Sequence, residues 1–373
     1  MKRLVLLGAG HAHVHVLKSL IGAPLLATGL ATEVTLISPY DRQVYSGMLP
    51  GWVAGHYELE QCVIPLRPLV NKAGVIFYQT AATHIDFENR AVHCADGQKI
   101  SFDFLSIDTG PVADLSAIPG ALEYAISIRP IESFIQSVQR IKEMISLRGT
   151  SQRTRIAFVG AGAGGVELAL AMQYAFSASR VEVTLISAAN TLPGNVGPRL
   201  SRILSKQGVR VLVNQSASRI ESGTIYLQSG TTVEADIIIV TTGTIAAPWL
   251  KQSGLATDDR GFVLVNDYLQ SVSHENVFAA GDCATMMNYV RPKSGVYAVR
   301  AGPPIAANLR HALRRESLAA YAPQARSLYL LSTGDKHAIA SWGNFALEGR
   351  WVWRWKDQID RGFMAKYVLP ANL

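Results

Sequence analysis

Cysteine is scarce in this 373-residue chain, and long apolar runs are absent. The three cysteines, Cys62, Cys94 and Cys283, lie far apart without metal-ligand spacing, which excludes a disulfide-stapled secreted scaffold. We therefore expect a reducing, cytoplasmic setting. No run of roughly 18 apolar residues occurs, so no transmembrane helix is predicted. The first apolar run, Leu4 to Leu7, is too short for a signal peptide and is interpreted as a strand.

Charged residues are also few. They make up 17% of the chain against 49% hydrophobic residues, a balance that favours buried parallel sheets and two folded domains. The net charge of +7 favours anionic partners such as dinucleotide phosphates or an anionic membrane. Because dense Lys and Arg runs and nucleic-acid-binding signatures are missing, we expect no nucleic-acid partner.

One sequence pattern occurs twice. Residues 3–10, RLVLLGAG, are echoed by residues 155–162, RIAFVGAG, and the hexapeptide EVTLIS follows each at 33–38 and 182–187. Each copy continues with an expected hairpin, at 91–104 and 223–233, and with a buried strand that ends in Thr-Gly. This duplication predicts an α/β fold of two Rossmann-like, three-layer dinucleotide-binding domains, the second inserted in the first, plus a short C-terminal extension.

The second glycine turn has the complete dinucleotide-binding pattern, Gly160-x-Gly162-x-x-Gly165, between a strand and a helix. The first turn keeps Gly8 and Gly10 but has His13 in the third position. We expect either that the helix sits slightly away from the strand or that the His13 ring points outward.

Three histidines follow the first turn. His11 and His15 stand one helical turn apart, which permits a metal interpretation. No carboxylate or thiolate nearby completes such a site, so we expect no metal and interpret these side chains as hydrogen-bond donors or packing groups.

Serine occupies the position after each second strand where an acidic residue usually binds the adenosine ribose. Ser187 leaves room for a 2′-phosphate without supplying a cation, and Arg180 or Arg199 helps only if the fold brings either near. The choice between NADH and NADPH therefore stays open.

Five motifs in order cover almost the whole chain: Gly8-x-Gly10, Thr109-Gly110, the Gly160 turn with Glu167, Thr242-Gly243, and Val277-Phe-Ala-Ala-Gly281-Asp282. In this order the chain resembles the pyridine nucleotide-disulfide oxidoreductase superfamily. The resemblance implies that the first module binds FAD, that the inserted module binds NADH or NADPH, and that the Gly-Asp turn holds the flavin ribityl chain. No cysteine pair follows the first motif, so disulfide chemistry is not expected.

On this basis the domains are predicted at 1–115 with 265–325 for FAD, 116–264 for NAD(P)H, and 326–373 for the C-terminal segment. The residues expected to bind FAD are Gly8, Gly10, His11, Ala12, His13, Ser38, Arg42, Ala82, Thr109, Gly110, Gly281, Asp282, Tyr297 and Ala298. Those expected to bind NAD(P)H are Gly160, Gly162, Gly164, Gly165, Glu167, Ser187, Thr242 and Gly243.

Several of these residues have an alternative structural role. Asp282 is a flavin ligand by the resemblance and a helix N-cap by its position. The helix expected over 297–313 should begin anew at Pro303. Glu167, the candidate catalytic residue, either orders the nicotinamide site or caps its helix. Cys283 is a reactive thiol or, as we expect, a small buried residue.

A closer likeness is to the flavoprotein module fused ahead of selenide, water dikinase. It rests on segments 8–14, 296–304, 331–335 and 347–357. No kinase portion follows, so we do not expect selenophosphate synthesis by this chain alone. The chain is similar more loosely to the type II NADH dehydrogenases, whose glutamine-bearing quinone signature is replaced by Ala298-Val-Arg-Ala-Gly302.

The tail predicts a basic amphipathic helix, because Trp351, Trp355, Ile359, Phe363 and Tyr367 recur at every fourth residue among basic ones. We expect this stripe to dock on the body or on a second subunit; the alternative is peripheral contact with the inner face of a membrane. A homodimer is left open.

The resulting hypothesis is an FAD-dependent NAD(P)H oxidoreductase. Hydride passes from the nicotinamide to the flavin and on to a small-molecule acceptor, a quinone or a small oxidised species, with a link to selenium metabolism as one option. The alternative is a non-catalytic FAD- and NAD(P)-binding regulatory or scaffold module.

Overall fold

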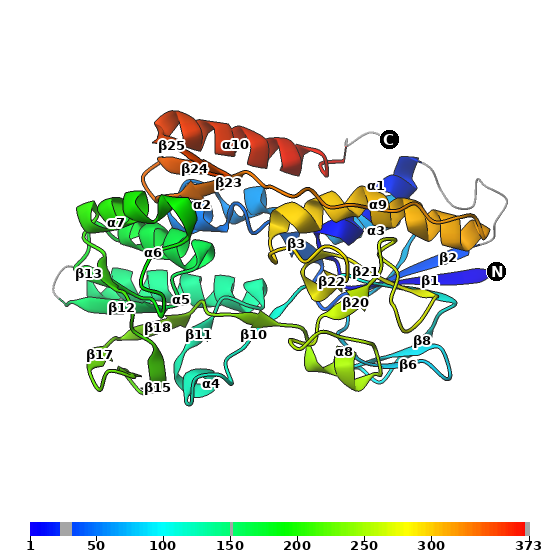
Figure 1. Ribbon diagram of the computed structural model, residues 1–373, viewed down its shortest axis with the longest axis horizontal. Helices are drawn as coiled ribbons and strands as arrows, with labels where there is room; N and C mark the ends of the chain where they lie inside the picture. Colours follow the sequence, from blue (N-terminus) through cyan, green and yellow to red (C-terminus); the bar gives the residue numbers. More distant parts are fainter. Residues whose placement is uncertain (23–31, 150–151, 370–373) are drawn as a thin grey trace.

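The computed structural model describes residues 1–22, 32–149 and 152–369, which form two lobes side by side (Figure 1). The first lobe is built on a five-stranded parallel sheet in the order β21-β9-β1-β2-β5. Its strands are β1 (Lys2–Leu7), β2 (Thr32–Ile37), β5 (Ile76–Tyr78), β9 (Phe104–Ile107) and β21 (Val277–Ala279). Since β21 lies far along the chain, the first lobe is discontinuous in sequence.

The second lobe repeats this plan, with a parallel sheet in the order β11-β18-β12-β13-β14. Its strands are β11 (Ile126–Ser127), β12 (Thr154–Val159), β13 (Val181–Ile186), β14 (Arg210–Leu212) and β18 (Ile237–Val240). The order β18-β12-β13-β14 matches β9-β1-β2-β5, so the fold class predicted from the duplication is confirmed. The domain boundaries stay a prediction.

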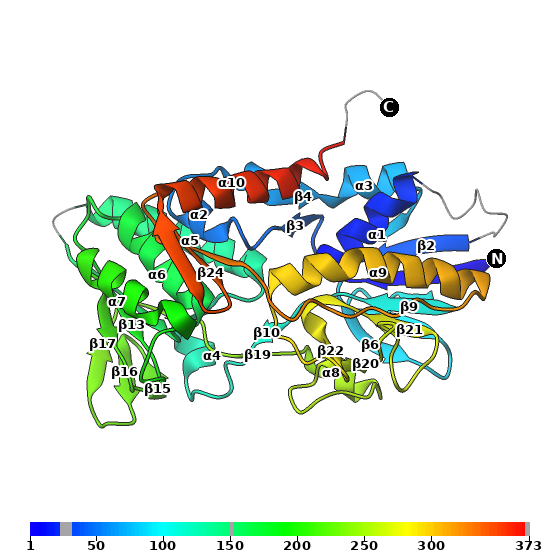
Figure 2. The same ribbon diagram turned by 45° about the horizontal axis from the view of Figure 1, so that its top comes forward.

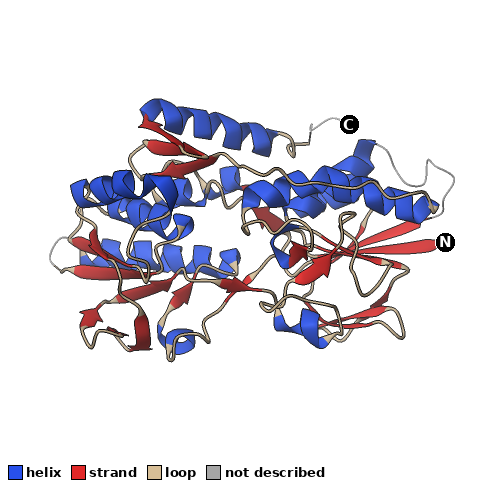
Figure 3. Cartoon of the chain, in the orientation of Figure 1, coloured by secondary structure: helices blue, strands red, loops and turns tan. Residues whose placement is uncertain are grey.

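Each parallel sheet lies between helices and an antiparallel sheet (Figure 3). The antiparallel sheets contain the expected hairpins, each extended by a third strand: β6 (Ala82–Asp86), β7 (Ala91–Cys94) and β8 (Lys99–Ser101), and β15 (Ala217–Glu221), β16 (Thr224–Leu227) and β17 (Thr232–Glu234). The helices are α1 (His11–Gly22), α3 (Leu66–Ala73) and α9 (Gly295–Arg314) in the first lobe, and α5 (Ile131–Arg148), α6 (Ala163–Ala175) and α7 (Gly197–Lys206) in the second.

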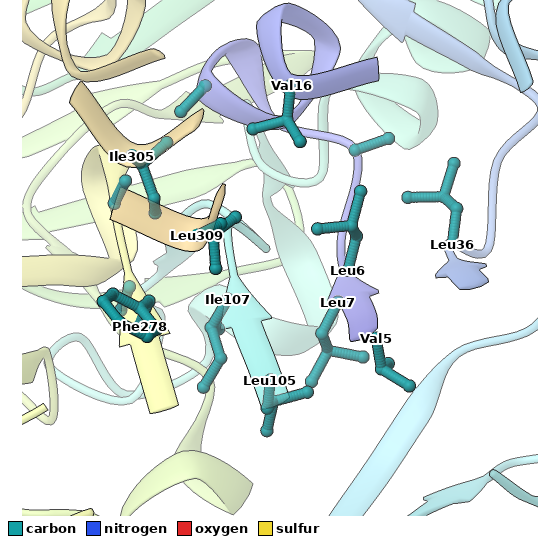
Figure 4. Packing of buried hydrophobic residues seen from close by; sticks show 14 of the residues in the cluster. Val5, Leu6, Leu7, Val16, Leu36, Leu105, Ile107, Phe278, Ile305 and Leu309 are labelled. Carbon is teal, nitrogen blue, oxygen red and sulfur yellow. The ribbon is translucent and has the colours of Figure 1, made fainter. Parts of the chain in front are cut away.

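The core of the first lobe lies between the sheet and helices α1 and α9 (Figure 4). Leu6 on β1 points toward Ile305 and Leu309 of α9, whereas Leu7 and its strand partner Ile107 on β9 point to the opposite face of the sheet. All three strand residues are at most 1% exposed. Strands covered on both faces read as continuous apolar runs, which is why the short run at residues 4–7 forms a central strand.

Smaller elements connect and flank the lobes. Two strands, β10 (Val112–Ala113) and β19 (Thr244–Ile245), pair antiparallel where the chain passes between the lobes. The others are β3 (Arg42–Val44), β4 (Val63–Pro65), α2 (Leu49–Val53), α4 (Ala121–Tyr124), α8 (Pro248–Gln252), β20 (Val263–Val265) and β22 (Ala284–Met286).

Helix α9 does not restart at Pro303, so that expectation is wrong. The helix runs from Gly295 to Arg314 through both prolines. Proline removes the bonds to the carbonyls four residues earlier, those of Val299 and Arg300. These residues line an open depression. Gly302 packs against His15 of α1 so closely that a Cβ added to Gly302 would lie 2.7 Å from the His15 Cβ. Tertiary packing thus keeps the helix continuous.

The C-terminal segment docks on the body of the protein (Figure 2). Strands β23 (Tyr329–Ser332), β24 (Ala338–Trp342) and β25 (Phe345–Gly349) form a small antiparallel sheet, and α10 (Arg350–Ala365) packs on it. Phe363 is 7% exposed and stacks on Tyr45, with ring centroids 4.5 Å apart.

The aromatic stripe of this helix is divided. Phe363 and Tyr367 are buried, whereas Trp351, Trp355 and Ile359 are exposed. Lys356, one of the basic residues of this helix, is buried; its ammonium donates to the Gly47 carbonyl and to the Asp360 carboxylate, each at 2.6 Å. The expectation of one apolar face and one basic face is therefore only half right.

Candidate cofactor-binding site

The first glycine turn approaches the end of β9 so closely that no side chain fits. Gly8 has φ +84°, and a Cβ there would lie 2.5 Å from the Asp108 carbonyl oxygen. At Gly10 a Cβ would lie 2.3 Å from the Asp108 carboxyl group. These two glycines are therefore required by the fold itself, before any ligand is considered.

His13 points inward, so of the two alternatives the outward ring is wrong. Its ring is buried; Nδ1 donates to the Gly8 carbonyl at 2.6 Å, and Nε2 accepts from the Ser106 hydroxyl at 2.8 Å. Burial lowers the pKa of His13 to about 4, so the ring is neutral. The histidine fills the space that a third glycine would have left between helix and strand.

A cavity extends from this turn along the edge of the sheet. It is lined by ten of the fourteen residues expected to bind FAD: Gly8, Gly10, His11, Ser38, Arg42, Ala82, Thr109, Gly110, Asp282 and Ala298. Ala12 and His13 lie behind it, and Gly281 and Tyr297 line a second cavity. The fold thus brings residues from both ends of the chain to one cleft.

Asp108 lies behind the glycine turn and was not among the sequence predictions. Its carboxyl group accepts hydrogen bonds from the N–H groups of Ala12 and His13, at 2.8 and 3.0 Å, and so caps α1. Burial raises its pKa to about 7, with the neighbouring Asp282 adding to the effect. The duplication offered one signal for this residue. When the two copies are aligned, Asp108 and Thr241 occupy the same position, directly before the repeated Thr-Gly pair.

Arg129 is the other residue that sequence reasoning missed. It precedes α5, lines the cavity, and burial lowers the pKa of its guanidinium while Asp282 opposes that shift. Burial likewise raises the pKa of Asp282, which Arg129 and Lys293 oppose. A cation and a carboxyl group therefore both line the cleft, and each favours the charged form of the other.

His11 provides the test of whether FAD fits. Its Nε2 atom is buried and has no hydrogen-bond partner in the described part of the chain, and burial together with Arg129 lowers its pKa to about 4. An orphaned imidazole nitrogen, a glycine cradle at a helix N-terminus and a buried cation suit a pyrophosphate and a flavin. The residues present fit the cofactor.

At the expected ribose position, the Ser38 hydroxyl donates to the Tyr40 carbonyl at 3.0 Å. Arg42 makes a two-pronged ion pair with Glu132, at 3.0 and 2.7 Å. Both side chains line the cleft but are engaged by the protein, so their part in FAD binding stays a prediction.

The second glycine turn combines one buried glycine with two open ones. A Cβ on Gly165 would lie 2.3 Å from the Gly160 carbonyl, whereas Gly162 and Gly164 are exposed, and a Cβ on either would have nothing within 4 Å. The open space lies over the N-terminus of α6, where backbone N–H groups favour an anion. Thr242 lies beside the turn, and its buried hydroxyl has no hydrogen-bond partner among the residues that the structure describes; Gly243 follows it.

Ser187 and Glu167 are both engaged by neighbouring backbone. The Ser187 hydroxyl donates to the Ala189 carbonyl at 3.2 Å, and Glu167 accepts the N–H of Ser332, on β23, at 2.7 Å. Burial raises the pKa of Glu167 to about 7, and Lys356 of α10 opposes this. Arg180 immediately precedes β13, so it lies at the opposite end of that strand from Ser187; Arg199 lies 3.9 Å from Glu348.

The thiol and metal alternatives gain no support. Cys283 is fully buried, its Sγ lies against the carbonyls of Ala280 and Ile107, and burial raises its pKa to about 12. Within residues 1–22, 32–149 and 152–369, no three His, Cys, Asp or Glu side chains come together as metal ligands.

Known proteins match the chain in sequence and in fold. Demethylphylloquinone reductase NdbB of Synechocystis sp. is 27% identical over 264 residues, covering 68% of this chain and 64% of that protein. NADH dehydrogenase-like protein YutJ of Bacillus subtilis is 26% identical over 295 residues, covering 77% and 78%. The sulfide:quinone oxidoreductase of Aquifex aeolicus has the same fold, with a TM-score of 0.80 and 20% identity over 98% of this chain and 91% of that chain.

The matched region thus spans just under two thirds of the Synechocystis relative. The sequence profile for pyridine nucleotide-disulphide oxidoreductases matches residues 2–302, which include both glycine turns and the Gly281-Asp282 turn. The chain belongs to the pyridine nucleotide-disulphide oxidoreductase family, whose members bind FAD and NAD(P)H.

Proposed function

We propose that the chain is an FAD-dependent NAD(P)H oxidoreductase that passes electrons to a quinone or another small oxidised molecule. The observation that carries this proposal is the single cleft that gathers ten of the expected FAD residues, within a fold that repeats the glycine turn in a second lobe. When bound, FAD would accept hydride from the nicotinamide and release electrons to the acceptor.

The chain itself supplies position and charge. The turn at Gly8 and the N-terminus of α1 would hold the pyrophosphate, and Asp282 would accept hydrogen bonds from the ribityl chain. Arg129 places a buried positive charge in the same cleft, which would favour negative charge on the ring system. The open N-terminus of α6 would hold the nicotinamide nucleotide.

Glu167 would position neighbouring parts of the chain and would not take part in the reaction itself. Its bond to the Ser332 backbone links α6 to the C-terminal segment, and its raised pKa follows from burial. We propose that it keeps the docked segment against the nicotinamide lobe.

A quinone acceptor is supported by the name of the Synechocystis relative, a demethylphylloquinone reductase. The link to selenium metabolism and the likeness to the dikinase-fused module have no such support and stay predictions.

We also propose peripheral contact with an anionic membrane. No helix in the described part of the chain has both the length and the apolar character needed to cross a bilayer. Large apolar side chains nevertheless remain exposed on α10 and on the β24–β25 hairpin: Trp342, Phe345, Leu347, Trp351, Trp355 and Ile359. Arg350 and Arg354 are exposed on the same helix, a combination typical of interfacial helices.

Anaerobic titration tests the enzyme against the non-catalytic alternative. The purified protein should show flavin absorption, and addition of NADH or NADPH without oxygen should bleach it. A subsequent quinone should restore the absorption. A flavin-loaded protein that neither nucleotide bleaches would favour the scaffold module.

A further inference from the structure

A second cavity, of about 290 Å³, shares only Asp282 with the FAD cleft. Its walls come from Gly281 and the β22 strand, the loop that follows it, the first turn of α9, and residues 321–323. Apart from Gly281, Asp282 and Tyr297, no residue expected to bind a nucleotide lines it. The cavity is therefore a separate site that borders the flavin-binding turn.

Aromatic side chains form much of this cavity. Phe262, Tyr289, Tyr297 and Tyr321 line it together with Met286. Phe262 is only 1% exposed and lies beneath the Lys293 ammonium, so it supports that cation, whereas the rings of Tyr289, Tyr297 and Tyr321 are only half-buried. Rings of this kind offer flat apolar surfaces, which suit a planar ligand.

One polar group in the cavity has no partner. The Tyr321 hydroxyl oxygen is buried and makes no hydrogen bond in the part of the chain that the structure describes. A buried hydroxyl left unpaired destabilises the folded state, so natural proteins seldom retain one without a ligand or water to satisfy it. Burial raises the pKa of Tyr321, so the hydroxyl stays protonated and can donate to a ligand oxygen.

The charges around the cavity favour an anion. Lys293 donates to the Ala284 carbonyl and to the Thr285 hydroxyl, and its ammonium lies 4.2 Å above the Phe262 ring. Arg291 is anchored by the Gln324 carbonyl at 3.1 Å.

The two carboxyl groups in the lining already have partners. Asp258 accepts from Thr285 at 2.7 Å and from the N–H groups of Arg260 and Phe262 at 3.0 Å. Arg129, Lys293 and the Ser294 N–H favour the charged form of Asp282. The lining carries the three cations Arg260, Arg291 and Lys293 against these two carboxyl groups, so its balance of charge is positive.

We propose that this cavity binds a planar aromatic molecule carrying a carboxylate or a similar anionic oxygen, with Tyr321 as the hydrogen-bond donor. The ring would lie beside Tyr289 and Tyr297, and the anionic group beside Lys293 and Arg291. This site does not depend on the proposed electron transfer, so it stands or fails separately from the NAD(P)H titration.

Binding is tested with 1-hydroxy-2-naphthoate, a fluorescent anionic bicycle, titrated into the flavin-loaded protein. Tyr321→Phe should weaken binding at least tenfold while leaving the melting temperature unchanged or higher, because the removed hydroxyl makes no hydrogen bond within the described residues. Tyr268→Phe is the control, since Tyr268 is exposed and lies outside the cavity. If Tyr321→Phe and the parent protein bind the naphthoate with equal affinity, the proposal is overturned, and a water molecule becomes the partner of the Tyr321 hydroxyl.

A second pair of variants blocks the cavity without touching its polar groups. Met286→Trp fills it and should abolish binding, whereas Met287→Trp, at the adjacent residue that is 58% exposed, should bind normally. Neutral 1-naphthol should bind at least tenfold more weakly than the naphthoate. Equal binding by the two tryptophan variants, equal binding of the two ligands, or no binding by the parent protein would each overturn the proposal.

Discussion

His13 and Thr241 hold the same backbone carbonyl in the two halves of the duplicated fold. The Gly8 carbonyl accepts from His13 Nδ1 at 2.6 Å, and its counterpart at Gly160 accepts from Thr241 Oγ1, also at 2.6 Å. In the second half the helix has Gly165 at this contact, and the donor is the hydroxyl of Thr241 at the end of the strand. In the first half the helix supplies the donor, which leaves Asp108, at the position of Thr241, to cap α1.

Restoring the glycine pattern at His13 should therefore destabilise the protein. His13→Gly removes two buried hydrogen bonds and leaves a void, so we expect a loss of about 3–5 kcal/mol in the free energy of unfolding. Urea denaturation measures it. His15→Gly places glycine in the same helix at a half-buried site that packs against Gly302, and should cost about 1–2 kcal/mol. Similar losses for both variants would contradict the role given to His13.

The Asp108 carboxyl group makes stability depend on pH. Its pKa is about 7 in the folded protein, against 3.8 for a free carboxyl. Between these values the folded state keeps a proton that the unfolded state has released, so the Asp108 contribution to the free energy of unfolding falls as pH rises, by on the order of 4 kcal/mol. Glu167, His11 and His13 titrate in the same window in both proteins, so the difference between the Asp108→Asn and parent profiles isolates Asp108. That difference should change by this amount between pH 4 and 7.5. An unchanged slope would refute this assignment.

The two kinds of glycine in the second turn should respond differently to alanine. Gly162→Ala meets open space, so the melting temperature should change by little while KM for the preferred nicotinamide nucleotide rises, because the new methyl group occupies the expected phosphate position. Gly165→Ala meets the Gly160 carbonyl and should lower the yield of folded protein. A normal KM for Gly162→Ala would remove this turn from the nucleotide site.

The sequence predicted those features that local patterns determine. The repeated strands, the glycine turns and the hairpins follow from residue order along short segments, and all of them occur. Arg129 is a single residue that the fold brings into the cleft, so no pattern marks it. Asp108 stands in the repeated Thr-Gly segment, but its bonds to α1 depend on how the helix meets the strand end. The local rule for proline failed at Pro303 because helix packing against α1 outweighs the lost backbone bonds.

In the C-terminal segment, too, a local pattern predicts the helix but not its contacts. The four-residue period of the aromatic stripe correctly predicts a helix. Which residues of the stripe are buried depends on which part of the helix contacts Tyr45 and the first lobe. Phe363 does reach it, and Trp351 does not.

The final prediction separates docking from membrane contact within this one helix. Phe363 is 7% exposed and stacks on Tyr45, so Phe363→Ala should cost about 3–5 kcal/mol and lower the melting temperature. Trp351 is 53% exposed, and Trp351→Ala should change stability by less than about 1 kcal/mol.

Vesicle binding should show the opposite order. Replacing Trp351, Trp355 and Ile359 together by serine should leave a folded protein that no longer sediments with vesicles containing phosphatidylglycerol. Binding by the parent protein should weaken as salt is raised, because exposed arginines such as Arg354 contribute about 1 kcal/mol each near an anionic surface. If the triple variant sediments as well as the parent protein, the exposed half of the stripe does not contact lipid, and a second copy of the chain becomes the better candidate for covering it.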